Sequence, residues 1–213
     1  PGNSNESIFE IQFDKELNQT NGLYRMMAPY PRDGTYPDGN DEFRVSPHLV
    51  TEFEKYLGDR RAGNRTYLTY TGGGWYVYAA SHVLWKYVGT EGTPSSVTGS
   101  SASGYRIGNQ ESDANWIIYR YPDILLMKAE ALVLQGDFGQ AVQLINQVRT
   151  RARIEPVADI SNKNTLEDII LEERAKEFCG EGKRYFDLIR LGRRNNFERK
   201  DRLIEILAEN KSY

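Results

Sequence analysis

The chain reads Ile124-Leu125-Leu126-Met127-Lys128-Ala129-Glu130-Ala131-Leu132-Val133-Leu134 just past its midpoint, with apolar residues on nearly every face of a helix. We therefore expect this helix to be buried all round. Gly136-Asp137 interrupts the pattern, and a second helix with a single apolar stripe follows. The stripe consists of residues at helical spacing, namely Phe138, Ala141, Val142, Ile145 and Val148. Two helices joined by so short a turn are expected to form an antiparallel hairpin.

Small residues mark the places where these two helices would approach most closely. Ala129 and Ala141 occupy the expected contacts and Gly136 occupies the turn, which fits one tetratricopeptide-like unit. Pro156 then stops the second helix. Because one such unit cannot bury its faces alone, further helices should pack against it.

Two more helices are predicted downstream. Thr165-Leu166-Glu167-Asp168 is a start signal of the capping-box type for a third helix at 166–178. The inner side of this helix should carry three apolar residues, Ile169, Ile170 and Phe178. Gly180 and Gly182 are its expected terminators, and a short fourth helix at 183–190 interleaves aromatic and ionic residues.

Four strings occur in order through this region: Arg120-Tyr121-Pro122-Asp123-Ile124-Leu125-Leu126, Ala129-Glu130-Ala131, Ile145-Asn146-Gln147-Val148-Arg149-Thr150-Arg151-Ala152 and Glu173-Arg174-Ala175-Lys176-Glu177-Phe178. A fifth extends the series, Glu181-Gly182-Lys183-Arg184-Tyr185-Phe186-Asp187-Leu188-Ile189-Arg190. Together they resemble the C-terminal signature of the SusD/RagB family. Residues 5–11 and 49–60 are similar to the family's middle region.

Members of that family are surface lipoproteins of the Bacteroidetes outer membrane that capture nutrients, usually glycans. They pass the cargo to a TonB-dependent, SusC-like transporter. The resemblance implies a SusD-like tetratricopeptide-type helical scaffold with long loops and a few short strands. It also implies a glycan-binding subunit that delivers oligosaccharides at the cell surface. Two alternatives stay open: a helical-repeat scaffold for protein interactions, and a peptide-capturing member of the same family.

The chain is shorter than a whole member of that family, so we expect a fragment of a longer protein. Residues 1–115 would form a loop-rich middle region and residues 116–213 the C-terminal helical region, together one structural unit. No lipobox cysteine or apolar signal segment occurs at Pro1. No apolar run is long enough to span a bilayer, so we expect membrane attachment only through a lipid anchor outside this sequence.

The N-terminal half predicts short strands, long loops and one clear helix. The strands are expected at 8–13, 75–78 and 83–88, and the loops at 17–41 and 89–115. Ser46-Pro47 opens the helix as a cap and a first-turn residue, and Gly58 ends it. The apolar face of this helix would be formed by Leu49, Phe53 and Leu57.

Glycan capture requires flat aromatic rings that stack on sugar rings, with polar groups nearby to bond the hydroxyls. The chain has 14 Tyr and 3 Trp residues, which is enough for such a platform. We favour the loop residues Tyr24, Arg25, Tyr30 and Tyr36, followed by Trp75 and Tyr76. None of these belongs to the matched strings, so the family transfers no role to them. The alternative is that these aromatic residues pack locally.

Ionic residues recur inside the matched helices, where the neighbouring positions are apolar. We predict that they form a structural ion-pair network, because buried charges need partners and arginine pairs well with carboxylates. The members are Arg120, Glu130, Arg149, Glu173, Arg174, Glu177, Arg184 and Asp187, with Arg151 and Arg190 as further candidates. If such a pair is buried, changing Glu130 or Arg184 to Ala should cost on the order of 3 kcal/mol.

An enzyme is not predicted. His48 and His82 lie in unrelated contexts, without a nucleophile signature or a metal-ligand spacing, and we expect no cofactor. Adjacent Glu172 and Glu173 point to different helix faces and make a poor glycosidase pair. Four residues could offer oxygen ligands to calcium, namely Asp33, Asp38, Asn40 and Asp41, but they lack the spacing of an EF-hand loop. A solvated acidic turn is therefore favoured, and a structural calcium site there stays open.

Charge and cysteine content exclude other classes. The net charge of −3 and pI near 5.6 disfavour nucleic acid binding, since the basic residues near the C-terminus alternate with acidic ones. Cys179 is the single cysteine, so no intrachain disulfide can form. Its place at the end of a predicted buried helix favours an inert, small apolar side chain.

Overall fold

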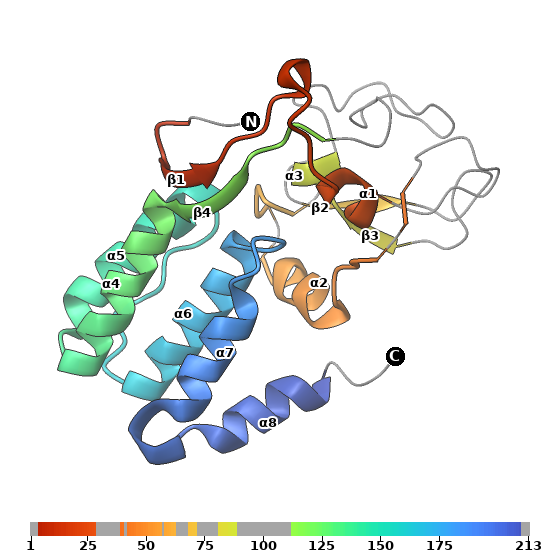
Figure 1. The fold of residues 1–213 in the computed structure, drawn as a ribbon. Coiled ribbons are helices and arrows are strands. Elements are labelled where there is room, and N and C mark those ends of the chain that lie inside the picture. Colours follow the sequence, from red (N-terminus) through yellow and green to blue (C-terminus); the bar gives the residue numbers. More distant parts are fainter. Residues whose placement is uncertain are drawn as a thin grey trace. The chain divides into compact units, whose positions relative to one another are not determined.

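The computed structural model describes residues 4–28, 39–40, 42–56, 58–62, 68–71, 81–88 and 112–209 (Figure 1). The chain forms two compact units. The first unit comprises Pro1–Val45 and Arg60–Arg120, and the second comprises Ser46–Asp59 and Tyr121–Tyr213. The single structural unit with a boundary at 115/116 stays a prediction. Residues 46–59 join the C-terminal helices because the helix they contain packs on one of them.

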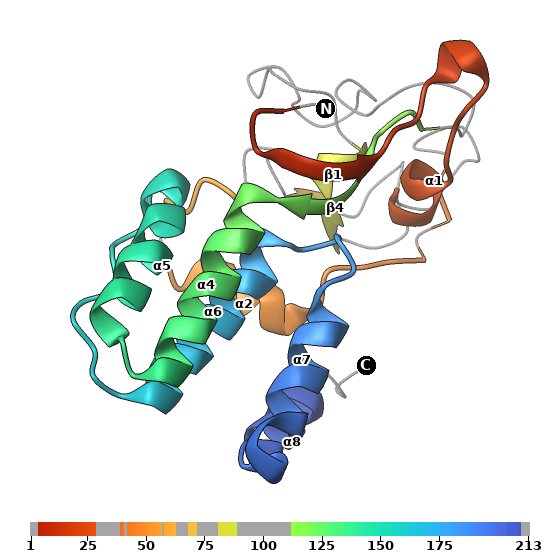
Figure 2. The same ribbon diagram turned by 60° about the vertical axis from the view of Figure 1, so that its left-hand side comes forward.

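The first unit contains an antiparallel two-stranded sheet of β1 (Ser7–Ile11) and β4 (Trp116–Arg120) (Figure 2). The strand predicted at 8–13 is confirmed in type, and it ends at Ile11. Its partner β4 was not predicted. A short apolar run such as 116–120 fits a strand or a buried helix equally well by periodicity, and only the pairing decides.

The other elements of the first unit are short. They are η1 (Lys15–Leu17), α1 (Leu23–Met27), β2 (Leu68–Thr71), β3 (Ser81–Leu84) and α3 (Trp85–Val88), with β2 antiparallel to β3. The predicted strand at 83–88 is wrong from Trp85 onward, because α3 begins at that residue. The predicted loop at 17–41 contains α1. The predicted strand at 75–78 lies outside the described residues.

The second unit is built on the predicted hairpin of α4 (Tyr121–Gln135) and α5 (Phe138–Ala152), which lie side by side in both ribbon views. Gly136 makes the turn with a φ of 83°, a left-handed conformation that glycine adopts without strain. Asp137 caps α5, since its side chain accepts a hydrogen bond from the Gln140 backbone amide at 3.2 Å. The hairpin and the tetratricopeptide-like turn are therefore confirmed.

The core of this unit lies between α4, α5 and α6 (Lys163–Glu177). Its fully buried members include Leu126, Ala129, Val133, Ala141, Ile145 and Leu166. The expectation that α4 is buried all round is wrong. Ile124 is 42% exposed and Leu134 is 45% exposed, because α5 and α6 cover only one side of the helix within this unit.

The ends of α5 and α6 differ from the expected signals. α5 ends at Ala152 because Arg153 adopts a left-handed conformation with a φ of 60°, so Pro156 is not its terminator. α6 is capped by Asn162, whose Oδ1 accepts from the Thr165 amide at 3.0 Å. The capping box predicted at Thr165 is therefore wrong, since three more residues fit the helix upstream.

α6 occupies the centre of the second unit and contacts α2 (Pro47–Glu54), α4, α5 and α7 (Arg184–Arg193). Ser46 caps α2 as predicted, but the helix ends at Glu54, before Gly58. The turn η2 (Arg194–Phe197) leads from α7 to α8 (Lys200–Glu209), which was not predicted. A second, small core holds Leu171, Leu191 and Ile206.

The fold class is mainly helical, as the sequence predicts. Among the described helices, none combines the length and apolar character needed to cross a membrane.

Candidate functional site

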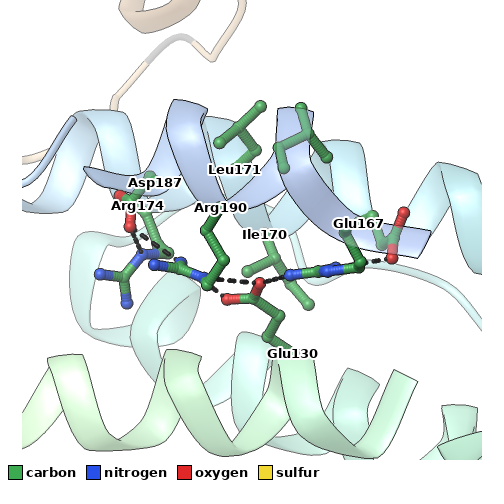
Figure 3. A pocket seen from close by; sticks show the side chains of 9 residues that line it. Glu130, Glu167, Ile170, Leu171, Arg174, Asp187 and Arg190 are labelled. Atoms are coloured by element: carbon green, nitrogen blue, oxygen red, sulfur yellow. Dashed lines mark hydrogen bonds and ion pairs between the residues drawn. The ribbon is translucent and has the colours of Figure 1, made fainter. Parts of the chain in front are cut away.

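A group of ionic side chains lies where α4, α6 and α7 meet, around a small pocket (Figure 3). Acidic residues come from α4, α6 and α7, and arginines reach them from α6, α7 and η2. The lining consists of Glu130, Glu167, Ile170, Leu171, Arg174, Asp187, Arg190, Leu191 and Arg194. Every polar residue of the pocket wall is therefore charged, three of them acidic and three of them arginines.

Arg174 holds one end of this group together. Its Nη1 donates to Asp123 Oδ1 at 2.8 Å, and its Nε donates to Asp187 Oδ1 at 2.9 Å. All three side chains are at most 5% exposed. The guanidinium also lies over the Phe178 ring, 5.0 Å from its centroid. Lys183 adds a second cation to Asp123.

Glu130 lies at the centre of the group. It accepts from Arg190 Nε at 2.9 Å and from Arg190 Nη2 at 2.8 Å, and it also pairs with Arg194. Burial by itself would raise the pKa of Glu130. The hydrogen bonds and charge of Arg190, together with the charge of Arg194, outweigh burial, so the pKa of Glu130 is lowered. The same contacts raise the pKa of Arg190 against the opposing effect of burial. The pair is therefore fully charged at neutral pH.

Glu167 extends the group toward the C-terminus. It accepts from Arg194 Nη1 at 2.7 Å and from Arg199 Nη1 at 2.9 Å. Arg199 continues to Asp168, with 2.6 Å between Nη2 and Oδ1. The group thus connects α4, α6, α7 and the segment that leads into α8.

A separate buried pair joins α5 to α6. Arg149 Nη1 donates to Glu173 Oε2 at 3.1 Å, and Lys176 Nζ lies 3.7 Å from the same oxygen. Arg149 and Lys176 also lie over the Tyr56 ring, at 4.6 Å and 4.4 Å from its centroid. Glu177 is fully buried and pairs with Arg151. Tyr56 thus attaches the 46–59 segment to the helices.

Two predicted members of the ion-pair network occupy other surroundings. Arg184 donates to the Leu171 carbonyl at 2.9 Å, and its Nη2 lies 3.9 Å from Glu172 Oε1. Burial lowers the pKa of Arg184, and the nearby carboxylates offset this only in part. Arg120 belongs to the first unit, where its Nη1 lies 3.9 Å from Glu6 Oε2.

Sequence reasoning missed Asp123, Glu167, Arg194 and Arg199 as members of the group. A signal for Asp123 exists, because it lies in a matched string and in the first turn of an apolar helix. The sequence pattern assigns Glu167 to a capping box instead. Arg194 and Arg199 lie in a run of mixed charge that is typical of a solvated surface. The turn at η2 places both arginines against Glu167 on α6.

The predicted glycan residues are placed only in part. Tyr24 is 4% exposed on α1, which favours local packing over a stacking platform at this position. Arg25 is exposed, and its Nε donates to Asn40 Oδ1 at 3.3 Å. The other four candidates lie outside the described residues: Tyr30, Tyr36, Trp75 and Tyr76. Of the residues considered for calcium, Asn40 is described and also donates to Glu42 Oε1.

Replacing Glu130 with Gln is expected to lower the free energy of unfolding at neutral pH by about 2 kcal/mol. This value is discounted because Arg190 is 42% exposed. Since folding lowers the pKa of Glu130, its contribution is present above the ordinary carboxyl pKa of 4.5 and is lost as the pH falls through the lowered value.

Urea denaturation at neutral pH and at about pH 3 measures this effect, and the difference between wild type and Glu130→Gln should shrink in acid. Glu205→Gln is the matched control, because Glu205 is 64% exposed and pairs only loosely with Arg202. An equal loss at both pH values would contradict the charged role of Glu130.

Comparison with known proteins identifies the class of this protein. Residues 5–212 match the model of the SusD family, and the chain belongs to that family. SusD-like protein P38 of Formosa agariphila is 30% identical, in an alignment that covers 87% of this chain and 39% of that protein.

Solved structures agree with this assignment. A SusD superfamily protein from Parabacteroides distasonis matches with a TM-score of 0.64 and 25% identity, covering 88% of this chain and 40% of that one. Surface glycan-binding protein A from Bacteroides uniformis matches with a TM-score of 0.65 and 26% identity, covering 88% of this chain and 37% of that one. The chain therefore spans about two fifths of the length of these relatives.

Proposed function

We propose that this chain is part of a nutrient-binding subunit that captures glycans at the surface of the outer membrane. The subunit would deliver oligosaccharides to a TonB-dependent, SusC-like transporter and would be held at the membrane by a lipid anchor. Membership of the SusD family across residues 5–212 is the observation that carries this proposal. The similarity to a surface glycan-binding protein supports glycans as the cargo class.

In this proposal the helical unit performs no catalysis. The ionic side chains around Glu130 and Arg174 bind one another, which leaves few polar groups to receive a ligand. A general acid or base would need a carboxylate free to exchange a proton with a substrate. The network is therefore better suited to structure than to chemistry.

The proposed glycan residues are Arg25, Tyr30, Tyr36, Trp75 and Tyr76, which belong to the first unit. Isothermal titration of the full-length protein against a panel of polysaccharides tests them. Changing a stacking residue, such as Tyr30 or Trp75, to Ala should weaken binding by roughly tenfold or more, equivalent to about 1.4 kcal/mol. Tyr185→Ala is the matched control, because Tyr185 is 68% exposed but lies on α7.

Loss of binding in the loop variants, with binding retained in the control, would support both the function and the residues. Loss of polysaccharide binding in the Tyr185 variant alone would indicate that the site lies on the helical unit. If no polysaccharide binds, the same titration is repeated with a panel of peptides, because a peptide-capturing member of the same family is the alternative. Failure of both panels would leave the alternative of a scaffold that binds only proteins.

Exposed apolar residues on α4 favour protein binding as a second role of the same molecule. Ile124, Met127 and Leu134 are 42%, 37% and 45% exposed, so α4 offers apolar side chains that a protein partner could cover. Co-purification with a TonB-dependent transporter would support the proposed delivery role, and an absence of any such complex would argue against it.

A further inference from the structure

Three metal-ligating side chains meet between α2 and α6 of the second unit. His48 and Glu52 lie one helical turn apart on α2, and Glu172 faces them from α6. One ligand atom from each residue lies within 4.8 Å of the others. The side chains of His48 and Glu172 are 13% and 15% exposed, and that of Glu52 is 7% exposed. This is a largely buried set of one imidazole and two carboxylates.

The spacing of these atoms fits a tetrahedral zinc site. Bonds from zinc to imidazole nitrogen and carboxylate oxygen are about 2.0–2.2 Å long, so neighbouring tetrahedral ligands lie about 3.3–3.6 Å apart. His48 Nε2 lies 3.4 Å from Glu172 Oε2, which matches one edge of such a tetrahedron. Glu52 offers a third ligand atom within 4.8 Å of the other two, and water can occupy the fourth position, as in zinc sites with three protein ligands.

The surroundings of the Glu172 carboxylate also point to a bound metal ion. Both of its oxygens are buried, and within the described part of the chain neither accepts a hydrogen bond. The nearest cations to Oε1 are Arg202 Nη2 at 3.7 Å and Arg184 Nη2 at 3.9 Å, beyond hydrogen-bond range. A buried carboxylate in this state is costly unless another group binds it.

The cations nearest to these carboxylates all make, or can make, other contacts. Arg184 donates to the Leu171 carbonyl, and Arg202 donates to Glu205 at 3.3 Å and lies 3.5 Å from Asp168. Lys55 pairs with Glu52, but its side chain is 52% exposed, so it can turn into water when a metal replaces it. Both arginines therefore have acceptors other than Glu172, and Lys55 can be solvated by water in place of its pair with Glu52.

We propose that His48, Glu52 and Glu172 bind one Zn²⁺ ion, which crosslinks α2 to α6. The donor set of one imidazole and two carboxylates suits zinc better than the all-oxygen sites of calcium and magnesium. Glu172 is far from His48 and Glu52 in the sequence, which is why no metal-ligand spacing is visible there. The ion would hold the 46–59 segment on the helical unit, independently of any glycan site.

Titration of the metal-free chain with ZnSO₄ tests this proposal, with calorimetry to measure binding and thermal melting to measure stabilisation. One equivalent should bind, and the melting temperature should rise with Zn²⁺ concentration because only the folded chain presents all three ligands. X-ray absorption at the zinc edge should show a single imidazole in a shell of nitrogen and oxygen ligands. His48→Ala should weaken binding by at least about tenfold.

Glu205→Gln is the control, since it changes a carboxylate near Arg202 without removing a proposed ligand. It should bind zinc like the wild type. Because His48→Ala could destabilise α2, Glu172→Gln provides a second variant of nearly the same shape, and circular dichroism checks that both remain helical. Equal binding by wild type and these variants, or a wild type that binds no zinc with an imidazole ligand, would overturn the proposal.

Discussion

Replacing Arg174 with Ala should lower the free energy of unfolding by about 4 kcal/mol, because it leaves buried carboxylates without their main partner. Arg174 is 5% exposed and donates to both Asp123 and Asp187, which are each 2% exposed. In this variant Lys183 still contacts Asp123 and Arg190 still contacts Asp187. We therefore expect the variant to be less stable but still folded. Urea denaturation followed by circular dichroism measures the change.

Two further variants sharpen this test. Arg193→Ala removes an exposed arginine from α7 and should change stability by no more than about 0.5 kcal/mol. Arg174→Lys keeps the charge but cannot donate to two carboxylates from one planar group, so it should fall between wild type and Arg174→Ala. If Arg174→Ala were as stable as Arg193→Ala, the network would have no structural role.

Replacing Leu126 with Ala should cost about 3 kcal/mol, since it leaves a cavity where α4 meets α5 and α6. Leu126 is 0% exposed and belongs to the main core of the second unit with Ala129, Ile145 and Ile170. These neighbours are held by three separate helices, so the space cannot close by a shift of one side chain. Chemical denaturation of both proteins gives the difference.

Ile124→Ala is the matched control on the same helix, because Ile124 is 42% exposed. We expect this variant to lose less than about 1 kcal/mol. A similar loss for both variants would mean that α4 is covered on both sides, as its composition predicts.

The helices of the second unit could be predicted because their signals are local. Gly136-Asp137 turns the chain and caps α5, and the apolar spacing of α5 gives its buried stripe, as Ala141, Ile145 and Val148 show. Strand β4 and helix α3 could not be predicted. Their short apolar runs suit a strand or a helix, and distant partners decide which forms.

The candidate site was less predictable than the fold. That ionic residues in an apolar helix need partners follows from physical chemistry alone, but the choice of partner does not. Arg174 could have paired with any nearby carboxylate, and it selects Asp123 and Asp187 only because α4 and α7 both contact this part of the unit. The aromatic residues of the loops have no periodicity from which partners could be inferred.

Sequence alone was enough to define the helical hairpin, the mainly α class and the SusD-like signature, because each depends on residues close together in the chain. Tertiary packing alone decides which face of α4 is buried, how Glu130 and Arg174 are neutralised, and that His48 meets Glu172. These contacts join residues far apart in the sequence, and their energies depend on burial and on distances of a few ångströms.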